Sequence, residues 1–134
     1  MTSRFEVLSI DCHNPERLAA FWCEVFGFTV LDRNEDSVEI GSWEPNVEDV
    51  RARQMPVTLV FVRVPESRTV KNRLHLDVSP IDMSTKDEVQ RLIALGAGRV
   101  DVGQGPDRGW EVLADPEGNE FCVVRSLAPG EFEG

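Results

Sequence analysis

The stretch Trp110-Glu-Val-Leu-Ala-Asp-Pro-Glu-Gly-Asn-Glu-Phe-Cys-Val-Val124 predicts a strand, a tight turn and a second strand. In the turn, proline presets φ, glycine supplies a positive φ, and the Asp and Asn side chains bond to nearby backbone. Alternation along the second strand places Glu120 and Cys122 on one face and Phe121 on the other. The hairpin therefore holds one carboxylate, that of Glu120, at a fixed point of a sheet.

A second strand signal comes earlier, in Arg73-Leu-His-Leu-Asp-Val78, where apolar and polar residues alternate strictly. This pattern predicts a half-buried strand that carries His75 and Asp77 on its polar face. An imidazole is a common metal ligand, and a carboxylate is a common acid or base. His75 and Glu120 could therefore meet on one sheet, although two groups do not define a metal site by their spacing alone.

Composition limits the classes of function. The chain has 134 residues, 41% of them hydrophobic, which suits one compact domain or two small fused modules. No apolar run is long enough to cross a bilayer, and the N-terminus has no signal-peptide pattern. The net charge of −10, without a basic cluster, argues against a nucleic-acid partner. Three cysteines, Cys12, Cys23 and Cys122, with no CxxC, disfavour a disulfide scaffold and indicate a cytoplasmic protein.

The first half of the chain predicts a strand, a helix and three more strands. Asn14-Pro15 is a helix start, an apolar face follows at helical spacing, and Gly27 ends the helix. The predicted strands are Phe5–Asp11, Phe28–Arg33, Ser37–Gly41 and Val57–Val64. The polar segment 42–56, bounded by prolines, is interpreted as a loop, either a plain surface loop or a lid.

The second half repeats this order after a joint at Pro65–Asn72. A helix starts at a capping box from Thr85 to Glu88, with Ser84 as the alternative cap, and stops at Gly96. The predicted strands are Arg73–Val78, Gly98–Val102, Trp110–Ala114 and Glu120–Arg125. Because neither half covers its sheet alone, we expect one α+β domain over residues 1–134, with modules 4–64 and 73–126 and a frayed tail at 127–134.

This doubled βαβββ order resembles the vicinal oxygen chelate superfamily, and most closely the glyoxalase-like proteins related to glyoxalase and bleomycin resistance proteins. The resemblance covers residues 4–126 and depends on three motifs. They are Asn14-Pro-Glu-Arg-Leu-Ala-Ala-Phe-Trp22, Lys71-Asn-Arg-Leu-His-Leu-Asp77 and Asp115-Pro-Glu-Gly-Asn-Glu-Phe-Cys122. It implies two βαβββ modules whose curved mixed sheets form a cup, often in a homodimer.

The resemblance also implies a divalent metal, held by His, Gln or Glu ligands from four strands, that binds two vicinal oxygens of a substrate. His75 and Glu120 match two of these ligands. The other two positions fall near Val7 and near Phe61 or Val62, which are apolar and cannot coordinate an ion. The metal set is therefore incomplete.

Three functions stay open. The first is binding of a small molecule in the cup without a complete metal site, with Trp43, Asp77, Trp110 and Cys122 as further ligand-binding residues. The second is a metal-dependent lyase, isomerase or dioxygenase in which His75 and Glu120 are catalytic and metal-binding. The third is an interaction module with a degenerate cup.

Overall fold

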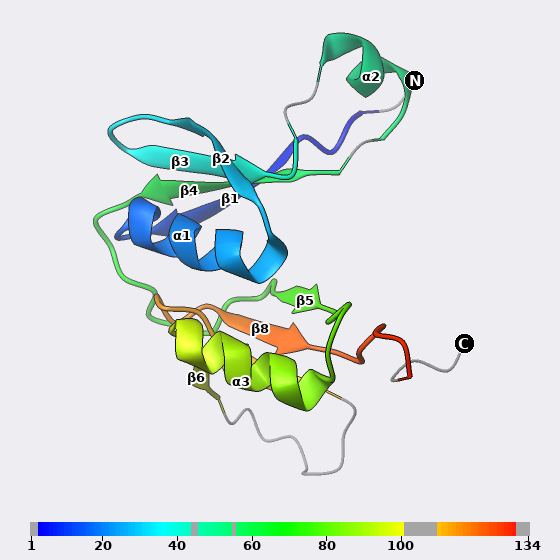
Figure 1. Cartoon of the computed structure of the whole chain (residues 1–134). Coiled ribbons are helices and arrows are strands. Elements are labelled where there is room, and N and C mark those ends of the chain that lie inside the picture. Colours follow the sequence, from blue (N-terminus) through cyan, green and yellow to red (C-terminus); the bar gives the residue numbers. More distant parts are fainter. Residues whose placement is uncertain (1–2, 44–45, 55, 101–109, 131–134) are drawn as a thin grey trace. The chain divides into compact units, whose positions relative to one another are not determined.

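The computed structural model describes residues 3–43, 46–54, 56–100 and 110–130. The chain divides into two compact units, residues 1–67 and 68–134, and the boundary falls inside the predicted joint 65–72. Each unit contains a four-stranded mixed sheet with a helix on it (Figure 1). Among the described residues neither sheet closes into a barrel, so the architecture is α+β, as the sequence predicts.

The first unit follows the predicted order of a strand, a helix and three strands. Its main elements are β1 (Val7–Cys12), α1 (Pro15–Phe26), β2 (Thr29–Arg33), β3 (Ser37–Gly41) and β4 (Thr58–Arg63). In space the strands are ordered β1-β4-β3-β2, with β1 parallel to β4 and the other neighbours antiparallel. The first strand therefore pairs with the last strand of its own module.

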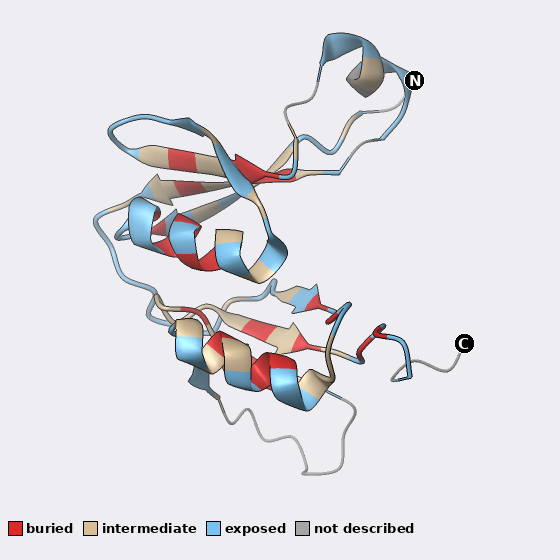
Figure 2. Ribbon diagram, in the orientation of Figure 1, coloured by how far each residue is buried: buried red, intermediate tan, exposed pale blue. Residues whose placement is uncertain are grey.

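Helix α1 begins and ends where the sequence predicts. The side chain of Asn14 accepts a hydrogen bond from the Arg17 amide at 3.1 Å, and Gly27 ends the helix with φ at 70°. The helix contacts β3 and β4 through its apolar face, and Figure 2 shows the buried residues gathered there. The core residues of this unit are Leu18, Phe21, Trp22, Val38, Ile40, Leu59 and Phe61, each at most 4% exposed.

The segment 42–56 is not a plain loop, so that interpretation was wrong. It contains a short helix, α2 (Val47–Ala52). The side-chain oxygen of Asn46 accepts a hydrogen bond from the Asp49 amide at 2.9 Å, and its amide nitrogen donates to the Asp49 carboxylate at 2.8 Å. This N-cap stabilises a helix that has too few apolar residues to show a helical period in the sequence.

The second unit repeats the topology of the first. It contains β5 (Leu76–Val78), α3 (Thr85–Leu95), β6 (Gly98–Arg99), β7 (Glu111–Ala114) and β8 (Glu120–Val123). The strands are ordered β5-β8-β7-β6, and β5 is parallel to β8. All four strands are shorter than predicted: β5 begins at Leu76 rather than Arg73, β6 ends at Arg99, β7 begins at Glu111 rather than Trp110, and β8 ends at Val123 rather than Arg125. Residues 101–102 of the predicted strand 98–102 lie outside the described residues.

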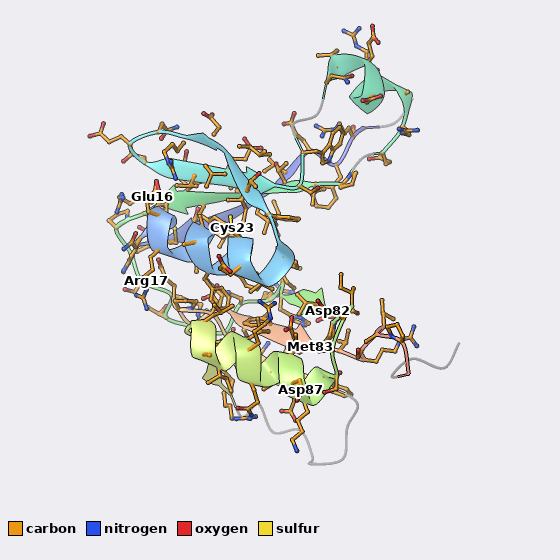
Figure 3. All side chains as sticks on the ribbon, viewed as in Figure 1. Glu16, Arg17, Cys23, Asp82, Met83 and Asp87 are labelled. Carbon is orange, nitrogen blue, oxygen red and sulfur yellow. The ribbon has the colours of Figure 1, made fainter. Side chains whose placement is uncertain are left out.

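Helix α3 takes the alternative cap. The hydroxyl of Ser84 accepts a hydrogen bond from the Asp87 amide at 3.1 Å, whereas the Thr85 hydroxyl donates to the carbonyl of Val124 at 3.0 Å. The predicted capping box from Thr85 to Glu88 is therefore wrong and Ser84 is the cap, because the Thr85 hydroxyl bonds to the residue that follows β8 instead. Figure 3 labels Asp87, in the first turn of this helix, and Met83, two residues before the helix begins.

The C-terminal segment is anchored at its start. The Leu127 amide donates to the carbonyl of Pro80 at 2.8 Å, and the Ser126 hydroxyl donates to the carbonyl of Met83 at 2.6 Å. Ala128 is 4% exposed. Residues 131–134 lie outside the described part, and the frayed tail at 127–134 stays a prediction. Among the described residues, no helix has the length and apolar character needed to span a bilayer.

Candidate functional site

One face of the β5–β8 pair gathers the polar residues that the sequence singles out. Phe121 is 1% exposed on the side of β8 that contributes to the core, while its neighbours Glu120 and Cys122 are only partly buried. Because side chains alternate along a strand, Glu120 and Cys122 share the opposite face. Asp77 is the register partner of Cys122, and registered residues of neighbouring strands lie on the same face. Asp77 and Cys122 are therefore side by side.

His75 lies one residue before β5 and is held by its own neighbour. Its Nδ1 atom is 3.1 Å from Oδ1 of Asp77, and the two side chains are 42% and 55% exposed. Strand β5 does not extend to His75, because its first registered pair with β8 is Leu76 with Phe121. The imidazole is therefore a partly exposed group, oriented by a carboxylate two residues further along the chain.

Glu120 has a different partner, which the sequence did not suggest. Its Oε1 atom is 3.3 Å from Nη1 of Arg68, and its side chain is 13% exposed. Arg68 also donates to the carbonyls of Val70 and Gly118, each at 2.8 Å, so the guanidinium is fixed at three points. The other carboxylate oxygen, Oε2 of Glu120, is buried and has no hydrogen-bond partner among the described residues.

The turn before β8 holds Glu120 in place. The buried carboxylate of Asp115 accepts hydrogen bonds from the amides of Glu117 and Asn119 at 2.9 and 3.0 Å, and from the Asn119 side chain. Gly118 has φ at 88°, a conformation that side chains disfavour. Asn72 donates to Asn119 at 2.9 Å. The predicted turn chemistry is confirmed for Asp115 and Gly118, whereas the Asn119 side chain bonds to two side chains rather than to backbone.

Three donors on this face lie close enough to suit a metal ion. One ligand atom each from His75, Asp77 and Cys122 lie within 4.8 Å of one another, and Glu120 does not belong to this group. Around a tetrahedral ion with bonds of roughly 2.0–2.3 Å, donor atoms are about 3.3–3.8 Å apart. Because His75 and Asp77 are partly exposed, small rotations of their side chains can close this difference. The donor set therefore fits an ion with one open position.

The positions that the resemblance assigns to further metal ligands are apolar in the first unit. Val7 begins β1 and is partly exposed, and Phe61 is fully buried in the core beside α1. Val62 is half-buried. None of these three side chains has a donor atom, so they do not supply the two missing ligands.

The two tryptophans lie apart from this face or near a gap in the described residues. Trp110, 43% exposed, lines a hollow of about 360 Å³ together with Thr85, Lys86, Val89, Gln90, Arg99 and Glu111. None of the polar residues of the β5–β8 face lines this hollow. Trp43 is half-buried and directly precedes residues 44–45, which are outside the described part. Roles for Trp43 and Trp110 in ligand binding stay predictions.

Arg68 is the residue of this site that sequence reasoning missed. It lies in the joint between the modules, where no periodic pattern or turn motif assigns a direction to a side chain. The available signal was weak: Glu120 is a charged residue on a half-buried strand, and such a residue needs a counter-charge. That argument calls for a cation but does not choose among the arginines of the chain.

The doubled βαβββ topology and the polar face of β5–β8 define a small α+β protein of the vicinal oxygen chelate class. The chain belongs to the glyoxalase-like domain family, whose sequence profile matches residues 7–124. This confirms the resemblance drawn from the three sequence motifs. A search among curated proteins found no match.

Solved structures share the fold at low sequence identity. A glyoxalase/bleomycin resistance protein/dioxygenase family enzyme from Burkholderia phytofirmans PsJN has a TM-score of 0.62 and 20% identity, covering 90% of this chain and 97% of its own. A mutant of the fosfomycin resistance protein FosX from Listeria monocytogenes, complexed with Mn(II) and 1S,2S-dihydroxypropylphosphonic acid, has a TM-score of 0.62 and 11% identity, covering 94% and 92%. The trypanothione-dependent glyoxalase I of Leishmania major has a TM-score of 0.60 and 15% identity, covering 92% and 87%.

Proposed function

We propose that this chain binds a small molecule on the polar face of β5–β8, without the complete four-ligand metal set of its superfamily. The observation that carries the proposal is the buried, unpartnered Oε2 atom of Glu120. A buried acceptor without a hydrogen bond costs about 1–3 kcal/mol, so it needs an explanation. A ligand that donates a hydrogen bond to this oxygen supplies one.

The surroundings of Glu120 indicate the ligand chemistry. Arg68 balances the charge of the carboxylate through Oε1, which leaves Oε2 as an acceptor for a hydroxyl, amide or ammonium group. The imidazole of His75 and the thiol of Cys122 add a second polar contact region on the same strands. We therefore expect a small ligand with at least one hydrogen-bond donor.

A thermal-shift screen of small hydroxylated and amino compounds, including antibiotics, tests this function. A ligand at 100 times its Kd stabilises a protein by about 2.7 kcal/mol, so a true ligand gives a saturable shift. Glu120→Gln should lower the affinity for such a compound about tenfold or more, because one acceptor oxygen of the carboxylate is replaced by an amide NH2 donor. The matched control is Glu35→Gln in the exposed turn between β2 and β3.

The proposal fails if no compound gives a saturable shift. It also fails if Glu120→Gln and Glu35→Gln retain the same affinity for every compound that does.

A second candidate function is a divalent-metal-dependent lyase, isomerase or dioxygenase that acts on vicinal oxygens. The specific observation in its favour is the group of His75, Asp77 and Cys122. A bound divalent ion would polarise substrate oxygens as a Lewis acid. Asp77, whose Oδ1 atom is 3.1 Å from Nδ1 of His75, would be one of the three ligands. The FosX mutant, a fold relative, was solved in complex with Mn(II) and a dihydroxy compound.

Metal analysis separates the two candidates. Protein purified without chelators should contain about one divalent ion per chain if the second function holds, and His75→Ala should lose it. Absence of stoichiometric metal in the parent protein would count against the second function and would leave the first intact. The expected homodimer is a separate prediction, which light scattering on the purified protein tests.

A further inference from the structure

We propose that His75, Asp77 and Cys122 form a thiolate-containing site for a transition-metal ion of the zinc class, contained entirely in the second unit. The inference rests on the second candidate function and departs from the ligand set that the superfamily resemblance implies. The superfamily pattern assigns Glu120 to the ion; the geometry points to Cys122 instead.

The placement of the three donors follows from the strand pairing. Asp77 and Cys122 are register partners in the parallel β5–β8 pair, and His75 is two residues before Asp77. The Nδ1 to Oδ1 contact of 3.1 Å keeps the ring beside the carboxylate, and the three ligand atoms lie within 4.8 Å of one another. Backbone hydrogen bonds of a sheet, rather than a loop, therefore fix the spacing of the Asp77 and Cys122 backbones.

The charge pattern excludes Glu120 from this set. Its Oε1 atom pairs with Arg68 at 3.3 Å, and the same guanidinium donates to the carbonyl of Gly118 at 2.8 Å. To coordinate an ion at the three-donor group, Glu120 would have to leave Arg68 with its charge unbalanced. The positive charge of Arg68 would also repel a metal cation bound to Glu120. The ion is therefore expected at Cys122, two residues further along the same face.

The donor types select the ion. An imidazole, one carboxylate and one thiolate suit Zn²⁺ and Co²⁺, whereas Mg²⁺, Ca²⁺ and Mn²⁺ prefer sets of oxygen ligands. Three protein ligands leave an open position, as in catalytic zinc sites. Binding releases the thiol proton of Cys122 to solvent, because the thiolate is the ligand. We expect Zn²⁺ and Co²⁺ to bind more tightly than Mn²⁺.

Cobalt titration of the reduced, metal-free protein tests the site, because a thiolate bound to Co²⁺ gives a sulfur-to-cobalt charge-transfer band in the near ultraviolet. The parent protein should bind one Co²⁺ per chain and show the band, and Zn²⁺ should displace it. Cys122→Ser should abolish the band and weaken binding about tenfold or more. Glu120→Gln should retain both the band and the affinity.

Two further variants test which cysteine supplies the sulfur ligand. Cys12→Ala and Cys23→Ser, both in the first unit, should keep the band. The parent titration needs no substitution, so it remains decisive if a variant does not fold. The inference is overturned if the parent binds no stoichiometric Co²⁺ or Zn²⁺, if Co²⁺ binds without the band, or if Glu120→Gln loses the ion as Cys122→Ser does. None of these results would affect saturable binding of a metal-free compound in the thermal-shift screen. The small-molecule proposal and the metal-site proposal are therefore tested independently.

Discussion

Arg68 and Glu120 form an ion pair of 3.3 Å in the second unit, and their side chains are 32% and 13% exposed. The pair links the joint between the modules to the first residue of β8. Because the carboxylate is largely withdrawn from water, solvent screens this ion pair less than it screens an exposed pair. The interaction free energy of Arg68 and Glu120 therefore measures how much the joint stabilises the position of Glu120.

A double-mutant cycle with Arg68→Met and Glu120→Gln should give a coupling free energy of about 1–2 kcal/mol by urea denaturation. The matched control is the exposed pair of Arg33 and Glu16, at 2.9 Å, with side chains 57% and 56% exposed. Its cycle, with Arg33→Met and Glu16→Gln, should give about 0.5 kcal/mol or less. A coupling at Arg68 no larger than that of the surface pair would contradict the structural role given to Arg68.

Ser84→Ala should lower the free energy of unfolding by about 1 kcal/mol, because the Asp87 amide at the start of α3 loses its acceptor. Ser79→Ala, at an exposed position before the helix, is the control and should change stability by less than about 0.5 kcal/mol. Urea denaturation followed by circular dichroism measures both. Equal effects of the two substitutions would show that Ser84 is not the cap.

Ile40→Val should cost about 1 kcal/mol of stability, since the removed methylene group is fully buried between the sheet and α1. The same substitution at Ile81, which is 72% exposed, removes the same atoms without leaving a cavity. Ile81→Val should therefore stay within about 0.5 kcal/mol of the parent. The prediction is wrong if the two variants unfold at the same urea concentration with the same slope.

Burial raises the pKa of the Cys23 thiol above its ordinary value of 9.0, and the nearby Glu24 carboxylate adds to this. Alkylation requires the thiolate, so its rate at Cys23 should still be rising steeply at pH 9.0. Peptide mapping after timed reaction with iodoacetamide measures the rate. The same shift removes stability as the pH rises through the folded-state pKa of this thiol, because the unfolded chain ionises first.

Glu24→Gln tests the cause of the shift at Cys23. Removing the like charge should lower the pKa and increase the alkylation rate at a fixed pH below 9.0. An alkylation rate of the parent that levels off below pH 9.0 would be inconsistent with a raised pKa.

Most helices, strands and turns of this fold could be predicted from interactions between residues that are close in the sequence. Asn14 and Gly27 bound α1 as predicted, and Asp115 and Gly118 build the predicted turn, because caps and turns depend on residues a few positions apart. Helix α2 was missed because it lacks one of the two local signals of a helix. Its N-cap at Asn46 is a local signal, but its few apolar residues show no helical period.

The sequence by itself determined the order of the strands and of α1 and α3, and it identified the family. It also showed that His75 shares a face with Asp77 and that Glu120 shares a face with Cys122, since strand alternation needs no knowledge of distant residues. Tertiary structure decided the partners. Only the parallel pairing of β5 with β8 brings Asp77 beside Cys122, and only the path of the joint brings Arg68 to Glu120. Such contacts join residues about 45 to 52 positions apart, and their choice depends on the packing of the whole unit rather than on local propensity.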